Sequence, residues 1–135
     1  MSAASADGHA GYVRSAAVAY ARRGRRVVID HAPLRGGGCT CGRSGCGDAG
    51  KHPRGVEWQK RASADPDLIG RRFAADPDSN VGWLLGDGLA DIDFDAVEAA
   101  AAADVLMPTT PAVSGRPSAP LTHRFYLCPG LTATE

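Results

Sequence analysis

Apolar and polar positions in the first third of the chain follow first helical and then strand spacing. Aromatic and alanine side chains recur every three or four residues over 10–23, which predicts a helix that stops at Gly24. The apolar run VVID at 27–30 predicts a short buried strand. The apolar pattern then disappears over 33–55, so this segment is predicted to be a loop.

The rest of the chain returns to the same two periodicities. Asp65 followed by Pro66 predicts a helix start, because Asp caps a helix and Pro suits its first turn, and this helix runs to about residue 75. Apolar runs on both sides of a Gly-Asp-Gly sequence predict a β-hairpin with its tight turn at 86–88. The predicted elements are strands at 81–85 and 89–94, a helix at 96–106, a Pro/Ser/Gly loop at 108–120 and a strand at 123–127.

The length of 135 residues is sufficient for a hydrophobic core. We expect one domain over residues 10–135 after a disordered tail at 1–9. No apolar run reaches the length of a membrane span, and the N-terminal segment lacks the apolar centre and cleavage pattern of a signal peptide. We therefore predict a cytoplasmic protein without a membrane partner.

The formal net charge is zero, so the chain lacks the overall basic character of many nucleic-acid binders. Its charges are nevertheless unevenly distributed. Residues 1–61 hold 11 Lys and Arg against 4 Asp and Glu, whereas residues 62–135 hold 4 against 11. This asymmetry fits a basic half for an anionic substrate and an acidic half for a cation, and it fits a dipolar surface without function equally well.

The segment GGGCTCGRSGCGDAGKHPR holds four potential metal ligands within fourteen residues: Cys39, Cys41, Cys46 and His52. Three thiolates and an imidazole are the ligand set of a closed tetrahedral zinc site. The segment is rich in glycine and lacks the apolar pattern by which a core could hold it, so a metal would hold it in place. We predict a structural zinc loop at 36–54, with His31 and Cys128 as spare ligands. The spacing differs from the paired CxxC of common fingers, and incidental thiols in a flexible loop are the alternative.

Two carboxylates share one face of the predicted strand 89–94. Asp91 and Asp93 are two residues apart, and such side chains point to the same side of a strand. They repel each other unless a cation lies between them, and hard oxygen ligands favour Mg²⁺ or Mn²⁺. An EF-hand is excluded because Ala96 and Ala102 stand where its loop needs Gly and Glu. A solvated strand face is the alternative.

His123 begins the last predicted strand and follows the segment GRPSAPLT. Arg116 and Ser118 lie just upstream, so an imidazole, a guanidinium and a hydroxyl are available to bind a triphosphate opposite the metal. A lone histidine before a strand is more commonly structural or solvated. Triphosphate binding by this segment is therefore a hypothesis, and it requires that the segment lie beside the acidic strand.

Taken in order, these segments resemble the N-terminal domain of bifunctional DNA primase/polymerases, which belong to the archaeo-eukaryotic primase superfamily of phages, plasmids and actinobacterial mobile elements. The resemblance runs from about Ala16 to the last residue. It rests on AVAYARRG, GGGCTCG, GKHPRGVEW, DPDLIGRRFAADPDSNVGWLLGDGL, ADIDFD and GRPSAPLTHRFYL. The implied fold is an α/β (α+β) primase core related to the RNA-recognition fold, with the zinc-binding loop as an insertion.

The resemblance implies a nucleotidyltransferase that makes or extends primers on a DNA template from nucleoside triphosphates during DNA replication. Asp91 and Asp93 would match the catalytic residues that hold Mg²⁺ or Mn²⁺. His123 would match the nucleotide-binding histidine, with Arg116 and Ser118 in the same phosphate-side segment. A helicase, fused or as a partner, is also implied. The metal-binding loop that is often seen in this family would be matched by Cys39, Cys41, Cys46 and His52.

The family pattern has a third catalytic carboxylate on a later strand. After His123 the sequence holds one carboxylate side chain, Glu135. We therefore expect a primase/polymerase-like domain that is incomplete at its C-terminus. The alternative is a non-catalytic, zinc-stabilised module that binds nucleic acid or a protein partner.

Overall fold

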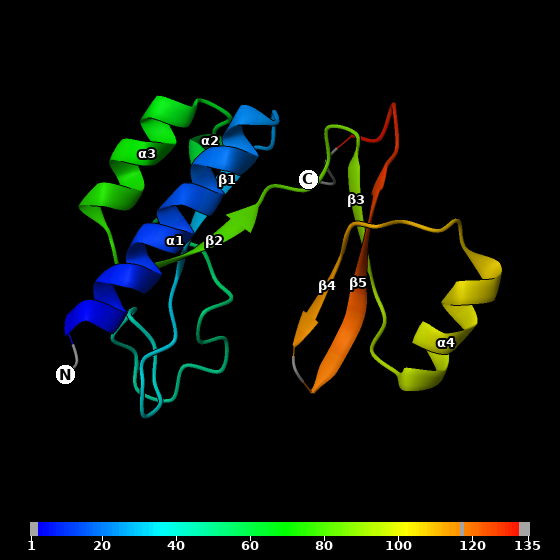
Figure 1. The fold of residues 1–135 in the computed structure, drawn as a ribbon, viewed down its shortest axis with the longest axis horizontal. Coiled ribbons are helices and arrows are strands. Elements are labelled where there is room, and N and C mark those ends of the chain that lie inside the picture. Colours follow the sequence, from blue (N-terminus) through cyan, green and yellow to red (C-terminus); the bar gives the residue numbers. More distant parts are fainter. Residues whose placement is uncertain (1–2, 117, 133–135) are drawn as a thin grey trace. The chain divides into compact units, whose positions relative to one another are not determined.

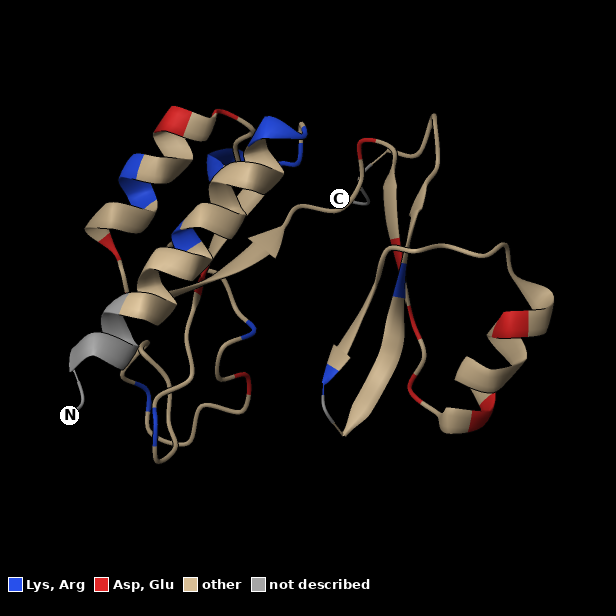
Figure 2. Ribbon diagram, in the orientation of Figure 1, with Lys and Arg blue, Asp and Glu red and all other residues tan. Residues whose placement is uncertain are grey.

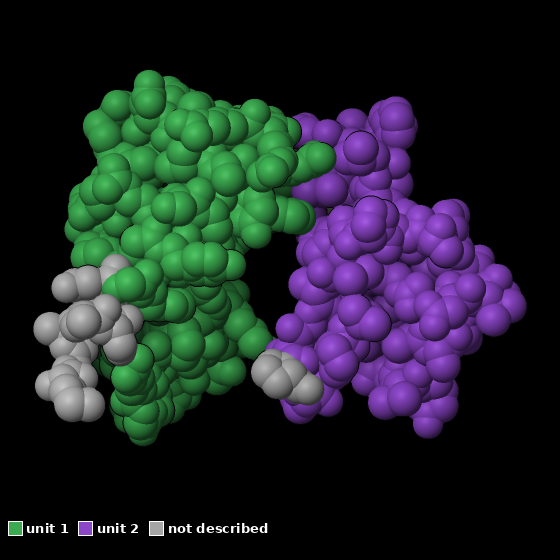
Figure 3. All heavy atoms as spheres, in the orientation of Figure 1, with its two compact units in different colours: residues 1–84 green, residues 85–135 purple. Residues whose placement is uncertain are grey.

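The computed structural model describes residues 3–116 and 118–132 and divides the chain into two compact units, Met1–Leu84 and Leu85–Glu135 (Figures 1 and 3). The architecture is mixed α+β, with four helices and two small antiparallel sheets in the described ranges. No described helix is both long enough and apolar enough to cross a lipid bilayer.

In the first unit, two helices pack against a two-stranded sheet. The helices α1 (Ala3–Arg22) and α3 (Pro66–Ala75) lie side by side (Figure 1). The strands β1 (Val27–His31) and β2 (Ser79–Trp83) pair antiparallel. The buried core consists of Val13, Ala17, Ala21, Val27, Ile69 and Phe73. Its two alanines allow α1 to approach its neighbours closely, since small side chains leave room for backbone contact.

The predicted elements of this unit are present, with shifted boundaries. The first helix begins at Ala3, within the segment predicted as a tail, and residues 1–2 lie outside the described residues. It ends before Gly24, whose φ of +78° is the left-handed conformation that glycine adopts readily. A one-turn helix, α2 (Trp58–Arg61), was not predicted.

The start of α3 is confirmed at the position that the Asp-Pro pair predicts. Pro66 is its first residue, and the Asp65 carboxylate accepts hydrogen bonds from the backbone N–H groups of Asp67 at 2.9 Å and Leu68 at 3.1 Å. The side chain thereby satisfies two of the donors that every helix N-terminus leaves without an intrahelical partner.

The second unit is a three-stranded antiparallel sheet with one helix. Its strands are β3 (Leu89–Asp93), β4 (Val113–Arg116) and β5 (Ala119–Leu127), in the order β3–β5–β4. The helix α4 (Val97–Leu106) is tied to β5 by Arg124, which is only 9% exposed. Its Nη2 donates to Asp104 Oδ1 at 2.7 Å and to the backbone oxygen of Ala100 at 3.2 Å.

The predicted hairpin between strands 81–85 and 89–94 is wrong, because β2 pairs with β1 and β3 pairs with β5. The tight turn itself forms: Gly86 and Leu89 exchange two backbone hydrogen bonds, and Asp87 and Gly88 both have positive φ. The strands on either side of this turn do not continue to pair with each other, because the chain from Gly88 onward pairs with β5 and the residue after it. Leu89 is opposite Leu127, and Cys128 N–H donates to Gly88 O.

The predicted loop at 108–120 is also wrong, since it contains β4 and the start of β5. Every residue of β4 is exposed, so the sequence lacks the alternation of buried apolar side chains that would predict this strand. Backbone pairing with β5 holds it, with an irregularity between Ser114 and Arg116. Gly115 is required there, because a Cβ at this position would overlap the backbone oxygen of Ala119.

We predict that Asp65→Ala lowers the free energy of unfolding of the first unit by about 1 kcal/mol, because two helix N–H groups lose their acceptor. Urea unfolding of the zinc-loaded protein, followed by tryptophan fluorescence, measures this, since Trp58 and Trp83 both lie in residues 1–84. Asp67→Ala is the matched control, because it removes a charge from the same turn without removing the cap. Equal effects of the two changes would contradict the capping role.

Candidate functional site

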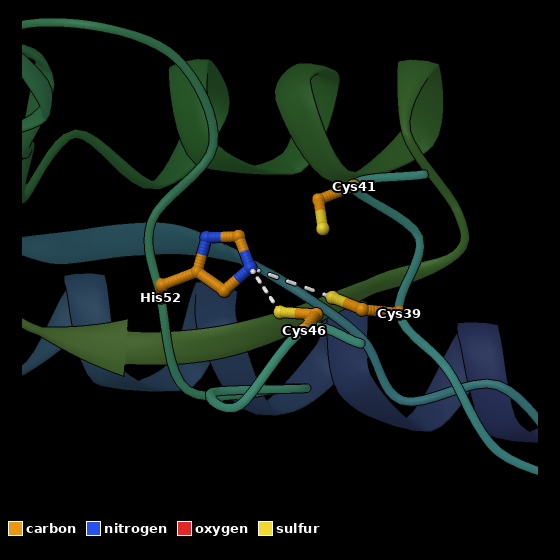
Figure 4. A group of neighbouring side chains, drawn as sticks. All are labelled: Cys39, Cys41, Cys46 and His52. Atoms are coloured by element: carbon orange, nitrogen blue, oxygen red, sulfur yellow. Dashed lines mark hydrogen bonds between the residues drawn. The ribbon is translucent and has the colours of Figure 1, made fainter. Parts of the chain in front are cut away.

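The four predicted zinc ligands come together in the first unit (Figure 4). One ligand atom from each of Cys39, Cys41, Cys46 and His52 lies within 4.8 Å of the others. His52 Nε2 is 3.4 Å from Cys39 Sγ and 3.5 Å from Cys46 Sγ. With ordinary zinc–sulfur and zinc–nitrogen bond lengths, a tetrahedral ion spaces such atoms by about 3.5 Å. The cluster therefore fits a Cys₃His zinc site.

Backbone hydrogen bonds attach the C-terminal end of the zinc loop to β1. His31 N–H donates to His52 O at 2.9 Å, and Arg54 N–H donates to Ile29 O at 2.8 Å. Before this end the loop has no regular secondary structure beyond isolated bridges. Gly50 has a φ of +77°, and a Cβ there would lie 2.6 Å from the Pro33 ring. Only glycine fits where the loop crosses this proline.

The pKa is lowered for two of the three thiols. Hydrogen bonding from the backbone of Arg43 is the main cause that lowers the pKa of Cys41 to about 6. Burial acts to raise the pKa of Cys39, but hydrogen bonds from the backbone of Cys41 and Gly50 outweigh it, and the pKa is lowered. Because zinc binds thiolates, these shifts reduce the cost of releasing protons when the metal binds.

The residues that support the ligands were not identified from the sequence. Thr40 stands between two ligands, and its Oγ1 lies 3.0 Å from His31 Nδ1 and 3.3 Å from Arg54 Nη2. Asp30 interacts electrostatically with His52, and burial raises the pKa of its carboxyl to about 6. Ligating histidines are commonly supported by a neighbouring carboxylate. A charged residue inside VVID is the signal that could have drawn attention to Asp30.

The spare ligand candidates are outside the cluster. The His31 ring lies beside the His52 ring, with 4.7 Å between centroids, but it is not among the four converging ligands. Cys128 lies in the second unit. The loop therefore supplies its complete ligand set by itself.

The second unit brings the predicted acidic pair and the predicted histidine together. Asp93 is directly opposite His123 in the β3–β5 ladder, and Asp91 lies two residues back on the same face. His123 Nδ1 is 2.9 Å from Asp91 Oδ2, and His123 Nε2 is 3.7 Å from Asp93 Oδ1. The imidazole thus contacts the two carboxylates through opposite ring nitrogens.

One carboxylate oxygen of the acidic pair, Asp91 Oδ1, is buried without a hydrogen-bond partner among the described residues. A buried carboxylate oxygen without a donor is costly, and a divalent cation would satisfy it. Two neighbouring carboxylates with such an oxygen fit the preference of Mg²⁺ and Mn²⁺ for hard oxygen ligands. The His123 ring lies between them, and the Cys₃His cluster is the only converging group of three or more such ligands found among the described residues.

The phosphate-side candidates occupy the β4–β5 connection. Arg116 ends β4 opposite Ala119, Ser118 lies in the turn, and both are exposed. Ser114, which was not predicted, is the residue directly opposite His123. Cross-strand partners share a face, so Asp93, His123 and Ser114 form one row across three strands. Ser114 was not identified from the sequence because the strand β4 was not predicted.

Comparison with family models matches residues 17–135 to the N-terminal domain of bifunctional DNA primase/polymerase. No curated protein and no solved structure matches the chain. The matched range covers nearly the whole chain, including the zinc loop and the Asp91–His123 sheet. The resemblance read from the sequence is thereby confirmed, and the chain belongs to the Prim-Pol family, the N-terminal domain of bifunctional DNA primase/polymerases.

Proposed function

We propose that the chain is a catalytic primase/polymerase domain that transfers nucleotides from (deoxy)nucleoside triphosphates to a primer on a DNA template. Membership of the family implies a primase- or polymerase-related function with DNA and nucleotide binding. The observation that carries the finer proposal is the cross-strand arrangement of Asp91, Asp93 and His123 on one face of the β3–β5 pair. In this proposal the sheet of the second unit belongs to a core related to the RNA-recognition fold.

Asp91 and Asp93 are the residues that would hold Mg²⁺ or Mn²⁺. When bound, such ions lower the charge barrier to attack of a primer hydroxyl on the α-phosphate and to departure of pyrophosphate. His123 is 35% exposed at its side chain, so its imidazole can reach solvent-side ligands. We assign it to the triphosphate, where it exchanges its bond with Asp91 for a bond to a phosphate oxygen.

The remaining donors lie along the same sheet. Arg116 and Ser118 at the β4–β5 turn are exposed and are proposed to bind the outer phosphates. A guanidinium binds phosphate through two parallel hydrogen bonds, which orients as well as attracts it. The zinc loop is assigned a structural role, because all four of its converging positions are protein side chains and a closed site leaves no position for substrate.

We predict that the purified chain contains a single zinc ion, bound by the Cys₃His cluster. Cys41→Ser and Cys46→Ser, alone or together, are expected to lose it and to destabilise the first unit, because the loop has no core to replace the metal. Cys128→Ser should keep the full metal content. Elemental analysis after dialysis measures the ratio, and a wild-type protein without zinc would show the assignment to be wrong.

We predict that primer extension in Mn²⁺ is lowered at least about a hundredfold by Asp91→Asn and by Asp93→Asn, because each removes a charged ligand from the metal that activates the reaction. Asp95→Asn is the matched control, since it removes a neighbouring exposed carboxylate outside the row. Mn²⁺ binding followed by electron paramagnetic resonance provides a readout besides activity. Unchanged extension in both variants would overturn the catalytic proposal.

The second candidate is a zinc-stabilised nucleic-acid-binding module without turnover. It is favoured by one observation: the Cys₃His ligands already converge, whereas the His123 ring separates the two carboxylates. Zinc-loaded protein that binds DNA, neither binds Mn²⁺ nor extends a primer, and is indifferent to changes at Asp91 and Asp93 would favour this candidate.

A further inference from the structure

We propose that a groove in the first unit, lined by Trp58 and three arginines, holds a backbone phosphate of single-stranded DNA. The arginines are Arg54, Arg61 and Arg72, and the floor is formed by residues 27–29 of β1. The groove lies within residues 1–84, so it is separate in the chain from Asp91, Asp93 and His123. The choice of DNA rests on the proposed function, whereas the groove and its charge do not.

The net positive charge of the groove favours binding of an anion. Three guanidinium groups line it against one carboxylate, that of Asp76. Asp76 is half exposed, and its Oδ1 is 4.0 Å from Arg54 Nη1, so it neutralises the charge of Arg54 only weakly. Like charges held close together repel, and a phosphate between them removes that cost. The cavity has a volume of about 30 Å³, which suits the oxygens of a phosphate rather than a whole nucleotide.

Two of the three guanidinium groups, those of Arg54 and Arg72, are held by hydrogen bonds before any ligand arrives. Arg54 Nη2 donates to Asp78 O at 2.7 Å and to Thr40 Oγ1 at 3.3 Å, yet its Nε is buried without a hydrogen-bond partner among the described residues. Arg72 Nη1 donates to the backbone oxygen of Arg61. Gly55 leaves room for Arg61, since a Cβ there would lie 2.8 Å from Arg61 Nη1. A fixed guanidinium loses little entropy when it binds phosphate.

Trp58 favours a single strand over other phosphate ligands. It is half-buried at the start of α2 and lines the groove beside the arginines. An indole next to a phosphate site is a platform for an unpaired base, which a duplex does not offer. Lys and Arg lie together on α2 in Figure 2, so the basic surface continues from the groove along this helix and suits an extended strand.

The test uses the full zinc-loaded chain carrying Asp91→Ala and Asp93→Ala, without Mg²⁺ or Mn²⁺, so that its outcome is independent of catalysis. Binding of fluorescent oligothymidine is measured by anisotropy over a range of salt concentrations. Arg61→Gln is expected to reduce the slope of log affinity against log salt by about 0.7, as for one lost phosphate contact on a single strand. Arg71→Gln on α3, an exposed arginine outside the groove lining, is the matched control.

Trp58→Ala is expected to weaken binding about tenfold without a change in the salt slope, and Trp58→Phe is expected to restore most of the affinity because it keeps a stacking ring. Competition with a nucleoside triphosphate, with oligouridine and with duplex DNA distinguishes the sources of phosphate. The proposal is overturned if oligothymidine does not bind, if Arg71→Gln lowers the slope as much as Arg61→Gln, or if the triphosphate, RNA or duplex competes better than the single DNA strand.

Discussion

Convergence of four side chains on one point is the constraint on which the first unit depends. The loop at 36–54 contains no large buried apolar residue, and Cys39 is its one buried side chain of a hydrophobic type. Fixing each backbone residue costs roughly 1–2 kcal/mol of conformational entropy, and the few hydrogen bonds that join the loop to β1 do not offset that for the whole segment. A bound zinc ion would contribute its binding energy directly to folding, and the four candidate ligands already lie at coordination spacing.

The second unit depends on strand register instead of a metal. Its core is thin: Leu89 and Ala103 are the buried hydrophobic residues there among those described, and α4 exposes Val97, Val105 and Leu106. The pairing of β3 with β5 therefore has two roles: it holds the sheet together, and it places Asp93 opposite His123. A slip of one residue would send these side chains to opposite faces, so the geometry of the candidate catalytic row is as specific as the ladder that carries it.

Local chemistry was readable from the sequence, and long-range pairing was not. The cysteine loop, the Asp65 cap and the alternation of Asp91 and Asp93 depend on residues close in the chain, and the structure has the ligand cluster and the capped helix as predicted. The hairpin was wrong because a tight turn at Gly86–Leu89 does not determine which strands continue the ladder. β4 was missed because all its residues are exposed, and Ser114 was missed with it. Thr40 and Arg54 act through contacts that only the folded loop creates.

These contacts give the zinc loop a role beyond its own order. Thr40 lies between Cys39 and Cys41, so a metal bound by these ligands would fix the position of its hydroxyl, and that hydroxyl contacts Arg54 Nη2. Arg54 in turn presents its buried Nε, which has no hydrogen-bond partner in the described part of the chain, beside the proposed phosphate groove. The chain of contacts from ligand to hydroxyl to guanidinium is short and lies within one unit. Loss of zinc should therefore weaken phosphate binding as well as stability, although none of the four candidate zinc ligands lines the groove.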